Sequence, residues 1–181
     1  MTGLPSFTYH PDPLTTGSVK PADTLCRCCG KARGYIYTGP VYAVDDLQDC
    51  ICPWCIADGA AAQRFAATFT DEDGIGGYGT WDSVAVEIVR EIATRTPGFI
   101  GWQQEQWWTH CSDGGAFVGA MGRAELKAMG EQAVAAIRQD SGLDGKDWED
   151  LFAALDKNSG PTAYLFRCRH CDATGGYFDC D

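Results

Sequence analysis

Apolar residues recur with a helical period in two long segments of the chain. Residues 81–98 predict an amphipathic helix, capped near Asp82 and ended by Pro97, with its apolar face formed by Val84, Ile88, Val89 and Ile92. Residues 122–142 predict a second amphipathic helix that ends at Gly142, with a stripe formed by Leu126, Met129, Ala133 and Ile137. We interpret both helices as packing elements, since neither carries a catalytic motif.

Shorter helices are expected elsewhere. Residues 53–69 predict a helix that begins near Pro53, because proline is favoured in the first turn. Residues 146–155 predict another short helix, and residues 103–110 one or two further helical turns. Residues 70–80 are acidic and rich in glycine, which predicts a loop.

Strand-like segments alternate with these helices. Residues 34–44 are aromatic and β-branched around Gly39 and Pro40, which predicts a small hairpin with its turn at these two residues. Residues 162–166 predict a short strand, and a second aromatic stretch follows near the end of the chain. The pattern as a whole indicates the α+β class, with short hairpins and three to five helices.

The chain has 181 residues and contains ten cysteines. Its first residues lack the basic and apolar regions of a secretory signal, and no apolar run approaches the roughly 18 residues of a membrane span. We therefore expect a cytoplasmic protein with no membrane segment. Because thiols stay reduced in the cytoplasm, ten clustered cysteines favour metal binding or catalysis over a disulfide framework.

The strongest motif consists of two C-x-x-C pairs separated by 22 residues, namely Cys26 with Cys29 and Cys52 with Cys55. Zn²⁺ takes four soft ligands in a tetrahedron at about 2.3 Å, and each C-x-x-C turn offers two sulfurs to one side of the ion. Four cysteines leave no position for water, which predicts a structural zinc site. Cys28 and Cys50 are then spare thiols, and either could be a ligand instead.

A redox interpretation of the second pair remains as an alternative. The sequence C-P-W-C at a helix start is also typical of a disulfide oxidoreductase, with Cys52 and Cys55 as the redox pair. Such a motif normally follows a buried strand, whereas residues 44–50 are polar and acidic. A redox pair also needs no second C-x-x-C nearby, so we favour zinc.

A third C-x-x-C pair, Cys168 and Cys171, lies between the two strand-like segments near the end of the chain. This is the layout of a zinc knuckle, and it needs two more ligands. The nearest candidates by chemistry are His110 and Cys111. We expect His170, inside the C-x-x-C turn, to project away from the ion.

The fourth ligand of this second site is open. Asp113 or Cys180 could replace His110, because adjacent residues rarely bind the same metal. In the alternative without a metal, Cys111 is a small core residue and His110 is a buried histidine with satisfied hydrogen bonds.

Residues 95–119 gather three of the six tryptophans with three glutamines, a histidine and a cysteine. Such a run, here Trp102 to Cys111, can line a ligand groove, since tryptophan offers apolar faces and glutamine directional amides. We favour a core seam with its polar residues facing outward, because tryptophan burial needs no ligand to explain it.

These elements predict one compact domain over residues 1–181 that contains zinc-ribbon and zinc-knuckle elements. An N-terminal zinc lobe would span about residues 19–68. A helical middle and the C-terminal knuckle would span about residues 80–181.

Five segments also match a known pattern in the same order, namely LPSFTYHPDPLTTG, CRCCGK, VYAVDDL followed by CPWCIADGAAA, RTPGFIGWQQEQWWTHC and YLFRCRHC. On these residues the chain resembles the CbrC family, small bacterial proteins of undefined biochemistry named for a member associated with tolerance to a nuclease colicin. The resemblance implies that seven cysteines are family features: Cys26, Cys29, Cys52, Cys55, Cys111, Cys168 and Cys171. It implies no catalytic residue, and Asp172 stands where the family tends to have glycine.

Two classes of function follow. The first is a zinc-stabilised binding or immunity-type protein, whose net charge of −11 suits a basic protein partner and disfavours nucleic acid. The second is a zinc-dependent enzyme with an open metal position in the Trp102–Cys111 segment, or a thiol-redox protein. We find no Ser/His/Asp triad, no H-E-x-x-H and no phosphate-binding loop, so we favour the binding protein, with one bound zinc ion and potentially two.

Overall fold

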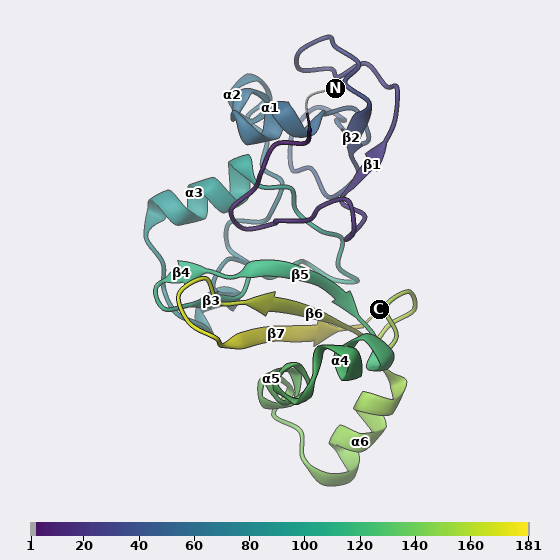
Figure 1. The fold of residues 1–181 in the computed structure, drawn as a ribbon. Helices are drawn as coiled ribbons and strands as arrows, with labels where there is room; N and C mark the ends of the chain where they lie inside the picture. Colours follow the sequence, from purple (N-terminus) through teal and green to yellow (C-terminus); the bar gives the residue numbers. More distant parts are fainter. Residues whose placement is uncertain (1–2, 181) are drawn as a thin grey trace.

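A three-stranded antiparallel sheet with the order β5-β6-β7 lies in the middle of the molecule (Figure 1). The structure, a computed structural model, describes residues 3–180. The strands are β1 (Val19–Pro21), β2 (Tyr35–Tyr37), β3 (Thr109–His110), β4 (Asp113–Gly114), β5 (Ala116–Met121), β6 (Thr162–Arg167) and β7 (Thr174–Asp179). The helices are α1 (Pro53–Ala57), α2 (Ala60–Phe65), α3 (Val86–Arg95), α4 (Arg123–Met129), α5 (Glu131–Ser141) and α6 (Gly145–Ala154), with a 3₁₀ turn η1 (Gly77–Gly79). This mixed α+β architecture confirms the predicted class.

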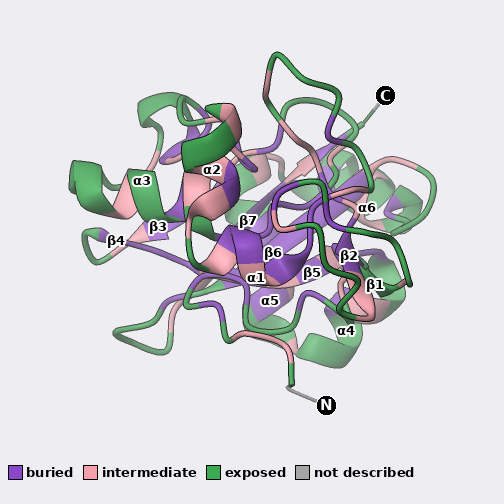
Figure 2. Ribbon diagram, turned by 90° about the horizontal axis from the view of Figure 1, so that it is seen from above, coloured by how far each residue is buried: buried purple, intermediate pink, exposed green. Residues whose placement is uncertain are grey.

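Helices α4 and α5 cover one face of the central sheet. α4 packs on β5, and α5 packs on β6 and β7, whereas α6 lies beside α4 at the outer end (Figure 1). The opposite side of the sheet faces the N-terminal part of the chain, which carries β1, β2, α1 and α2. Figure 2 shows buried residues along the central strands and exposed residues on the outer helices. None of the helices within residues 3–180 is long and apolar enough to cross a membrane.

The predicted hairpin over residues 34–44 is wrong. Its first half forms β2, which pairs antiparallel with β1, so that Tyr37 lies opposite Val19. Its second half turns away, and Tyr42 forms an isolated antiparallel bridge with Thr68. The phenol of Tyr37 donates a hydrogen bond to the carbonyl of Pro40 at 2.8 Å. The two apolar stretches therefore find different partners, both distant in sequence.

Glycines divide two of the predicted helices, which is why residues 3–180 contain six α-helices where the sequence predicts three to five. The helix expected over residues 53–69 breaks at Gly59, which has a φ of 77°. The helix expected over residues 122–142 breaks at Gly130, with a φ of 101° and a ψ of 177°. No helix continues through either conformation. Leu126 in α4 and Ala133 and Ile137 in α5 are buried as predicted, whereas Met129, the last residue of α4, is 39 % exposed.

The helix expected over residues 81–98 begins later than predicted. α3 starts at Val86, with Ala85 in the capping position, and ends at Arg95. Asp82 is not its cap, because the backbone carbonyl of Asp82 instead accepts a hydrogen bond from the hydroxyl of Thr109 at 2.6 Å. The predicted end before Pro97 and the burial of Ile92 are confirmed.

Residues 103–110 do not form the predicted helical turns. They run as irregular chain into β3, and Trp107 makes a parallel bridge with Ile75. The aromatic side chains explain the difference, since Trp107 is fully buried and Trp108 is 7 % exposed on the opposite side of an extended backbone. The core interpretation is confirmed for Trp107 and Trp108 and is wrong for Trp102, which is 42 % exposed. Glu105, expected to face outward, is only 3 % exposed.

Two other predictions hold. β6 and β7 form the expected hairpin around the third C-x-x-C pair, with Arg167 opposite Thr174 at its end. The predicted helix over residues 146–155 is α6. The hairpin matters for the candidate site, because the loop that connects its two strands places the third cysteine pair beside β3 and β4.

Candidate metal centres

Four cysteines converge in the N-terminal lobe, and we call them the first cluster: Cys26, Cys29, Cys52 and Cys55. All four sulfurs lie within 4.8 Å of one another. The sulfur separations are 3.8 Å for Cys26 to Cys55, 3.9 Å for Cys29 to Cys52 and 3.6 Å for Cys52 to Cys55. A zinc ion about 2.3 Å from four sulfurs separates them by about 3.8 Å. The first cluster therefore has the dimensions of a tetrahedral thiolate site.

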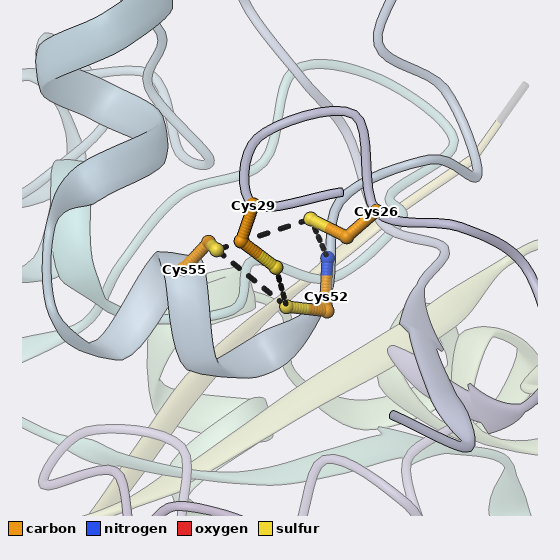
Figure 3. Close-up of side chains that lie close together, drawn as sticks. All are labelled: Cys26, Cys29, Cys52 and Cys55. Carbon is orange, nitrogen blue, oxygen red and sulfur yellow. Dashed lines mark hydrogen bonds between the residues drawn. The ribbon is translucent and has the colours of Figure 1, made fainter. Parts of the chain in front are cut away.

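Two structural elements bring the first cluster together. Cys26 and Cys29 lie on a tight turn after β1, and Cys52 and Cys55 lie at the start of α1 (Figure 3). Pro53 at the first helical position fixes the backbone of this helix start. The backbone amide of Arg27 donates to the carbonyl of Cys50 at 2.8 Å, which ties the turn to the chain entering the helix. A local turn and a helix start thus each supply one sulfur pair.

The surroundings of the first cluster favour a thiolate. The Cys52 thiol and the Cys52 backbone amide both donate to the sulfur of Cys26, the amide at 3.3 Å. The thiol donor is the largest influence, and these hydrogen bonds lower the pKa of Cys26 to about 4 against the opposing effect of burial. The Cys52 thiol that donates this hydrogen bond keeps its proton, so its own pKa is raised. Such a site gains from a divalent cation, which neutralises the sulfurs together.

A second cluster of four ligand groups lies at the loop end of the hairpin formed by β6 and β7, and its members are His110, Cys111, Cys168 and Cys171. The sulfurs of Cys111 and Cys171 are 3.9 Å apart. Nδ1 of His110 lies 3.4 Å from the sulfur of Cys168 and 3.7 Å from that of Cys171. A tetrahedral zinc ion separates a nitrogen and a sulfur ligand by about 3.6 Å. The adjacent residues His110 and Cys111 therefore both reach the same point.

Adjacent residues can share this site because the backbone turns sharply between them. His110 ends β3, and Cys111 and Ser112 form the two-residue connection to β4, with φ values of 54° and 56°. Two successive left-handed residues are typical of a type I′ hairpin turn. This turn swings the thiol of Cys111 back toward the side on which the imidazole of His110 lies.

Packing orients the imidazole of His110. Its ring stacks on the indole of Trp108, with the centroids 5.2 Å apart and the planes inclined by 8°. The indole itself lies against the backbone of Gly175 in β7, where a Cβ atom would be 1.9 Å from Cε2 of Trp108. Gly175 is therefore required for Trp108 to occupy this position, and Trp108 supports the candidate ligand.

Asp113 is not positioned as a ligand of the second cluster. Its Oδ1 accepts a hydrogen bond from the phenol of Tyr9 at 2.8 Å, and its Oδ2 accepts from Nε2 of His170 at 2.6 Å and pairs with Arg169. Burial opposes the charge, but the His170, Tyr9 and Gly114 donors keep the pKa of Asp113 below its usual range. The hydrogen bond from His170 and the ion pair with Arg169 connect the C-x-x-C loop to β4. His170 points away from the cluster, as predicted.

The structure also shows where the remaining cysteines lie relative to the two clusters. Cys28, Cys50 and Cys180 lie outside both groups of four. Cys111 is exposed, so it is not the small core residue of the alternative interpretation. The sulfur of Cys168 is buried and accepts from the amide of His170 at 3.4 Å. Against the opposing effect of burial, this bond and the one from His110 lower the pKa of Cys168 to about 6.

Sequence reasoning missed three supporting residues, namely Trp108, Gly175 and Arg169. The role of Trp108 could have been found from the spacing W-x-H, because alternate residues of an extended backbone lie on the same face. Gly175 carries no local signal, since its role depends on a tryptophan 67 positions earlier in the sequence. The structure brings all eight candidate ligands together in two groups of four.

The fold and the clusters define a cysteine-rich α+β protein with two four-ligand groups that could hold metal ions. Over residues 4–180 the chain matches the uncharacterised protein family UPF0167, and it belongs to this family. It is 45 % identical to the UPF0167 protein Mb2317 of Mycobacterium bovis, covering 97 % of this chain and 93 % of that protein. It is 44 % identical to the UPF0167 protein PA1536 of Pseudomonas aeruginosa, covering 93 % and 92 %. No solved structure matches the chain.

Proposed function

We propose that this protein binds two zinc ions, one in each cluster, and that both ions are structural. The observation that carries the proposal is the agreement of the ligand separations with tetrahedral zinc, 3.6 to 3.9 Å between sulfurs in the first cluster. Thiolate and imidazole are the ligands that zinc prefers in such sites. Four protein ligands per ion leave no position for a reactive water, which supports a structural over a catalytic role.

The experiment is elemental analysis of protein purified without added metal. The proposal expects two zinc ions per chain, removed by a strong chelator together with loss of tertiary structure, because metal binding is folding free energy in sites of this kind. Protein without zinc that instead holds a reversible disulfide between Cys52 and Cys55 would overturn the proposal. That result would support thiol-redox chemistry at the start of α1.

We further propose that the protein acts as a binding scaffold for a basic protein partner. Its formal net charge is −11, and zinc-bound thiolates make the metallated protein more negative, near −14, by −2 for a four-cysteine site and −1 for a site with one histidine. Such a charge repels a phosphate backbone and attracts a basic surface. The resemblance to the CbrC family, with its association with colicin tolerance, supports a cytoplasmic partner of the nuclease-toxin type.

The acidic run at residues 71–73 is the segment best suited to this partner. Two other acidic pairs on the surface already have basic neighbours within the chain, since Asp45 pairs with Arg27 and Asp150 with Lys146. Among residues 3–180 no ion pair involves residues 71–73. These carboxylates are therefore available to an incoming cation.

Charge steering changes association more than dissociation, which gives the test. The protein is immobilised through its N-terminus and exposed to a panel of basic nuclease toxins at rising salt. The expected result is a partner whose association rate falls with salt while its dissociation rate changes little, and whose association slows when Glu72 and Asp73 are replaced by Gln and Asn. Absence of any such partner, or direct binding of DNA at physiological ionic strength, would contradict the scaffold proposal.

A further inference from the structure

The two clusters differ in their access to solvent. In the first cluster Cys26, Cys52 and Cys55 are only 1 to 2 % exposed, and the remaining sulfur is half-buried. In the second cluster the buried cysteine is Cys168, whereas Cys111 and Cys171 are both exposed. One centre is thus shielded by the lobe around it, and the other presents two sulfurs to solvent.

The exposed sulfurs belong to two different loops that face each other. Cys111 lies in the two-residue turn between β3 and β4, and Cys171 lies in the connection between β6 and β7. Their sulfurs are 3.9 Å apart, and Cys111 and Ser112 both hold left-handed backbone conformations that are costly for residues other than glycine. Both exposed cysteines lie in loops, so rotation of their side chains can bring the two sulfurs together, whereas in the first cluster Cys52 and Cys55 are held at the start of α1.

We propose that Cys111 and Cys171 form a peroxide-reactive dithiol, whose oxidation to a disulfide releases the metal of the second cluster while the first keeps its own. The inference rests on the proposed zinc in the second cluster. A cysteine bound to zinc is a thiolate, and the thiolate is the nucleophilic form of the side chain. The susceptibility of cysteines to oxidation increases with their thiolate character and with their exposure to solvent. The ligand for this site is therefore a small oxidant, hydrogen peroxide.

The chemistry takes two steps. In the first, one thiolate of the pair attacks an oxygen of hydrogen peroxide, the O–O bond breaks, and a sulfenic acid and a hydroxide form. In the second, the other thiolate attacks the sulfenic sulfur, the S–S bond forms, and the S–O bond breaks with departure of a second hydroxide. The two sulfurs lose two electrons in total, hydrogen peroxide is reduced to two waters, and two protons come from solvent.

Disulfide formation removes two ligands from the ion at once. The sulfur separation falls from 3.9 Å to the S–S bond length of about 2.05 Å, which is far below the edge of a zinc tetrahedron. The ion retains only His110 and Cys168, so it is released. The hydrogen bond between Asp113 and His170 does not involve either oxidised sulfur. The hairpin of β6 and β7 therefore stays bonded to β4.

The experiment treats zinc-loaded protein with hydrogen peroxide and follows zinc release with a chromogenic chelator. The protein carries Cys180→Ser, which removes an exposed thiol outside both clusters and prevents cross-linking between chains. The expected result is loss of one of the two zinc ions, together with a disulfide between the peptides that contain Cys111 and Cys171. Dithiothreitol and added zinc should restore the starting content. The control variant Cys28→Ser removes a cysteine that lies outside both clusters, so it should release the same single zinc ion on treatment.

The outcomes separate this inference from the function on which it rests. Protein that contains only one zinc ion before treatment overturns the second zinc site, and this inference with it. Two zinc ions that are both retained, or both released together, overturn the peroxide-reactive pair and leave the two-zinc proposal standing. Release that accompanies a disulfide to Cys168 instead also overturns the assignment of the pair.

Discussion

The indole of Trp108 and the imidazole of His110 lie almost parallel, with their ring centroids 5.2 Å apart. Trp108 directly precedes β3 and His110 ends it, so their side chains lie on one face of an extended backbone, and Gly175 of β7 lies against the indole. Gly175 of the central sheet thereby positions the candidate metal ligand His110 through the indole of Trp108. Packing of the sheet and the geometry of the second cluster are therefore linked, which gives the first prediction.

Gly175→Ala should impair the second cluster without touching any ligand. The new Cβ would lie 1.9 Å from Cε2 of Trp108, so the indole must move and carry the His110 ring with it. We expect a loss of about 1–3 kcal/mol of stability, typical of an overpacked core. Zinc content should fall toward one ion per chain. Gly3→Ala is the control, since no atom lies within 4 Å of its Cβ. Full zinc content in Gly175→Ala would contradict the packing argument.

Cys29→Ser and Cys28→Ser should behave differently although the residues are adjacent. Cys29 belongs to the first cluster and Cys28 does not. Apparent binding free energies of structural zinc are about 10–16 kcal/mol, so loss of one ligand should release the ion and unfold the N-terminal lobe. Cys28→Ser should retain both ions. Zinc analysis and near-ultraviolet circular dichroism measure the two effects, and equal zinc loss in both variants would mean that the ligand set is different.

His10 should make stability depend on pH between about 6.5 and 4. The side chain is fully buried, and Nδ1 donates to the carbonyl of Pro97 at 2.6 Å. Burial lowers the pKa of His10 to about 4, against the smaller opposing effect of the Pro97 bond. Between these pH values the unfolded chain binds a proton that the folded chain excludes, so folding stability falls as pH falls.

The loss through His10 should reach about 3 kcal/mol at pH 4, since each pKa unit corresponds to about 1.4 kcal/mol. Urea unfolding of the protein and of His10→Gln at several pH values measures it. The variant should be less stable at pH 7 and should show a shallower decline toward low pH. Cluster thiolates contribute to both proteins, so the difference between the two curves isolates His10. Parallel curves would rule out this assignment.

Gly130→Ala should destabilise the fold through its backbone alone. Gly130 separates α4 from α5 with a φ of 101° and a ψ of 177°, and no atom lies within 4 Å of the position that a Cβ would take there. This region of conformational space is essentially restricted to glycine, and the cost is about 1–3 kcal/mol. Gly142→Ala, in an ordinary left-handed conformation, should cost less. Thermal unfolding compares them, and zinc content should remain unchanged in both.

Local sequence was enough to predict the C-x-x-C pairs of the two candidate metal clusters, but not the pairing of His110 with Cys111. A C-x-x-C spacing brings two sulfurs together through local turn geometry, so Cys26 with Cys29, and Cys168 with Cys171, could be paired without a structure. The helical period likewise predicted α3 and α6, because the apolar stripe of each helix needs only its own sequence. The positions of glycine indicated where helices could stop, but not that Gly130 would divide the stripe.

Long-range packing determined what the local patterns join. β2 pairs with β1 and not with the following residues, because the buried partners of Tyr37 lie elsewhere in the chain. His110 and Cys111 reach the same point only because a strained turn reverses the backbone and the hairpin of β6 and β7 lies opposite it. These contacts join residues that are far apart in sequence. Their free energy depends on how all of the packed elements fit together, which a local sequence pattern does not contain. The fold therefore places His110, and not Asp113 or Cys180, in the second cluster.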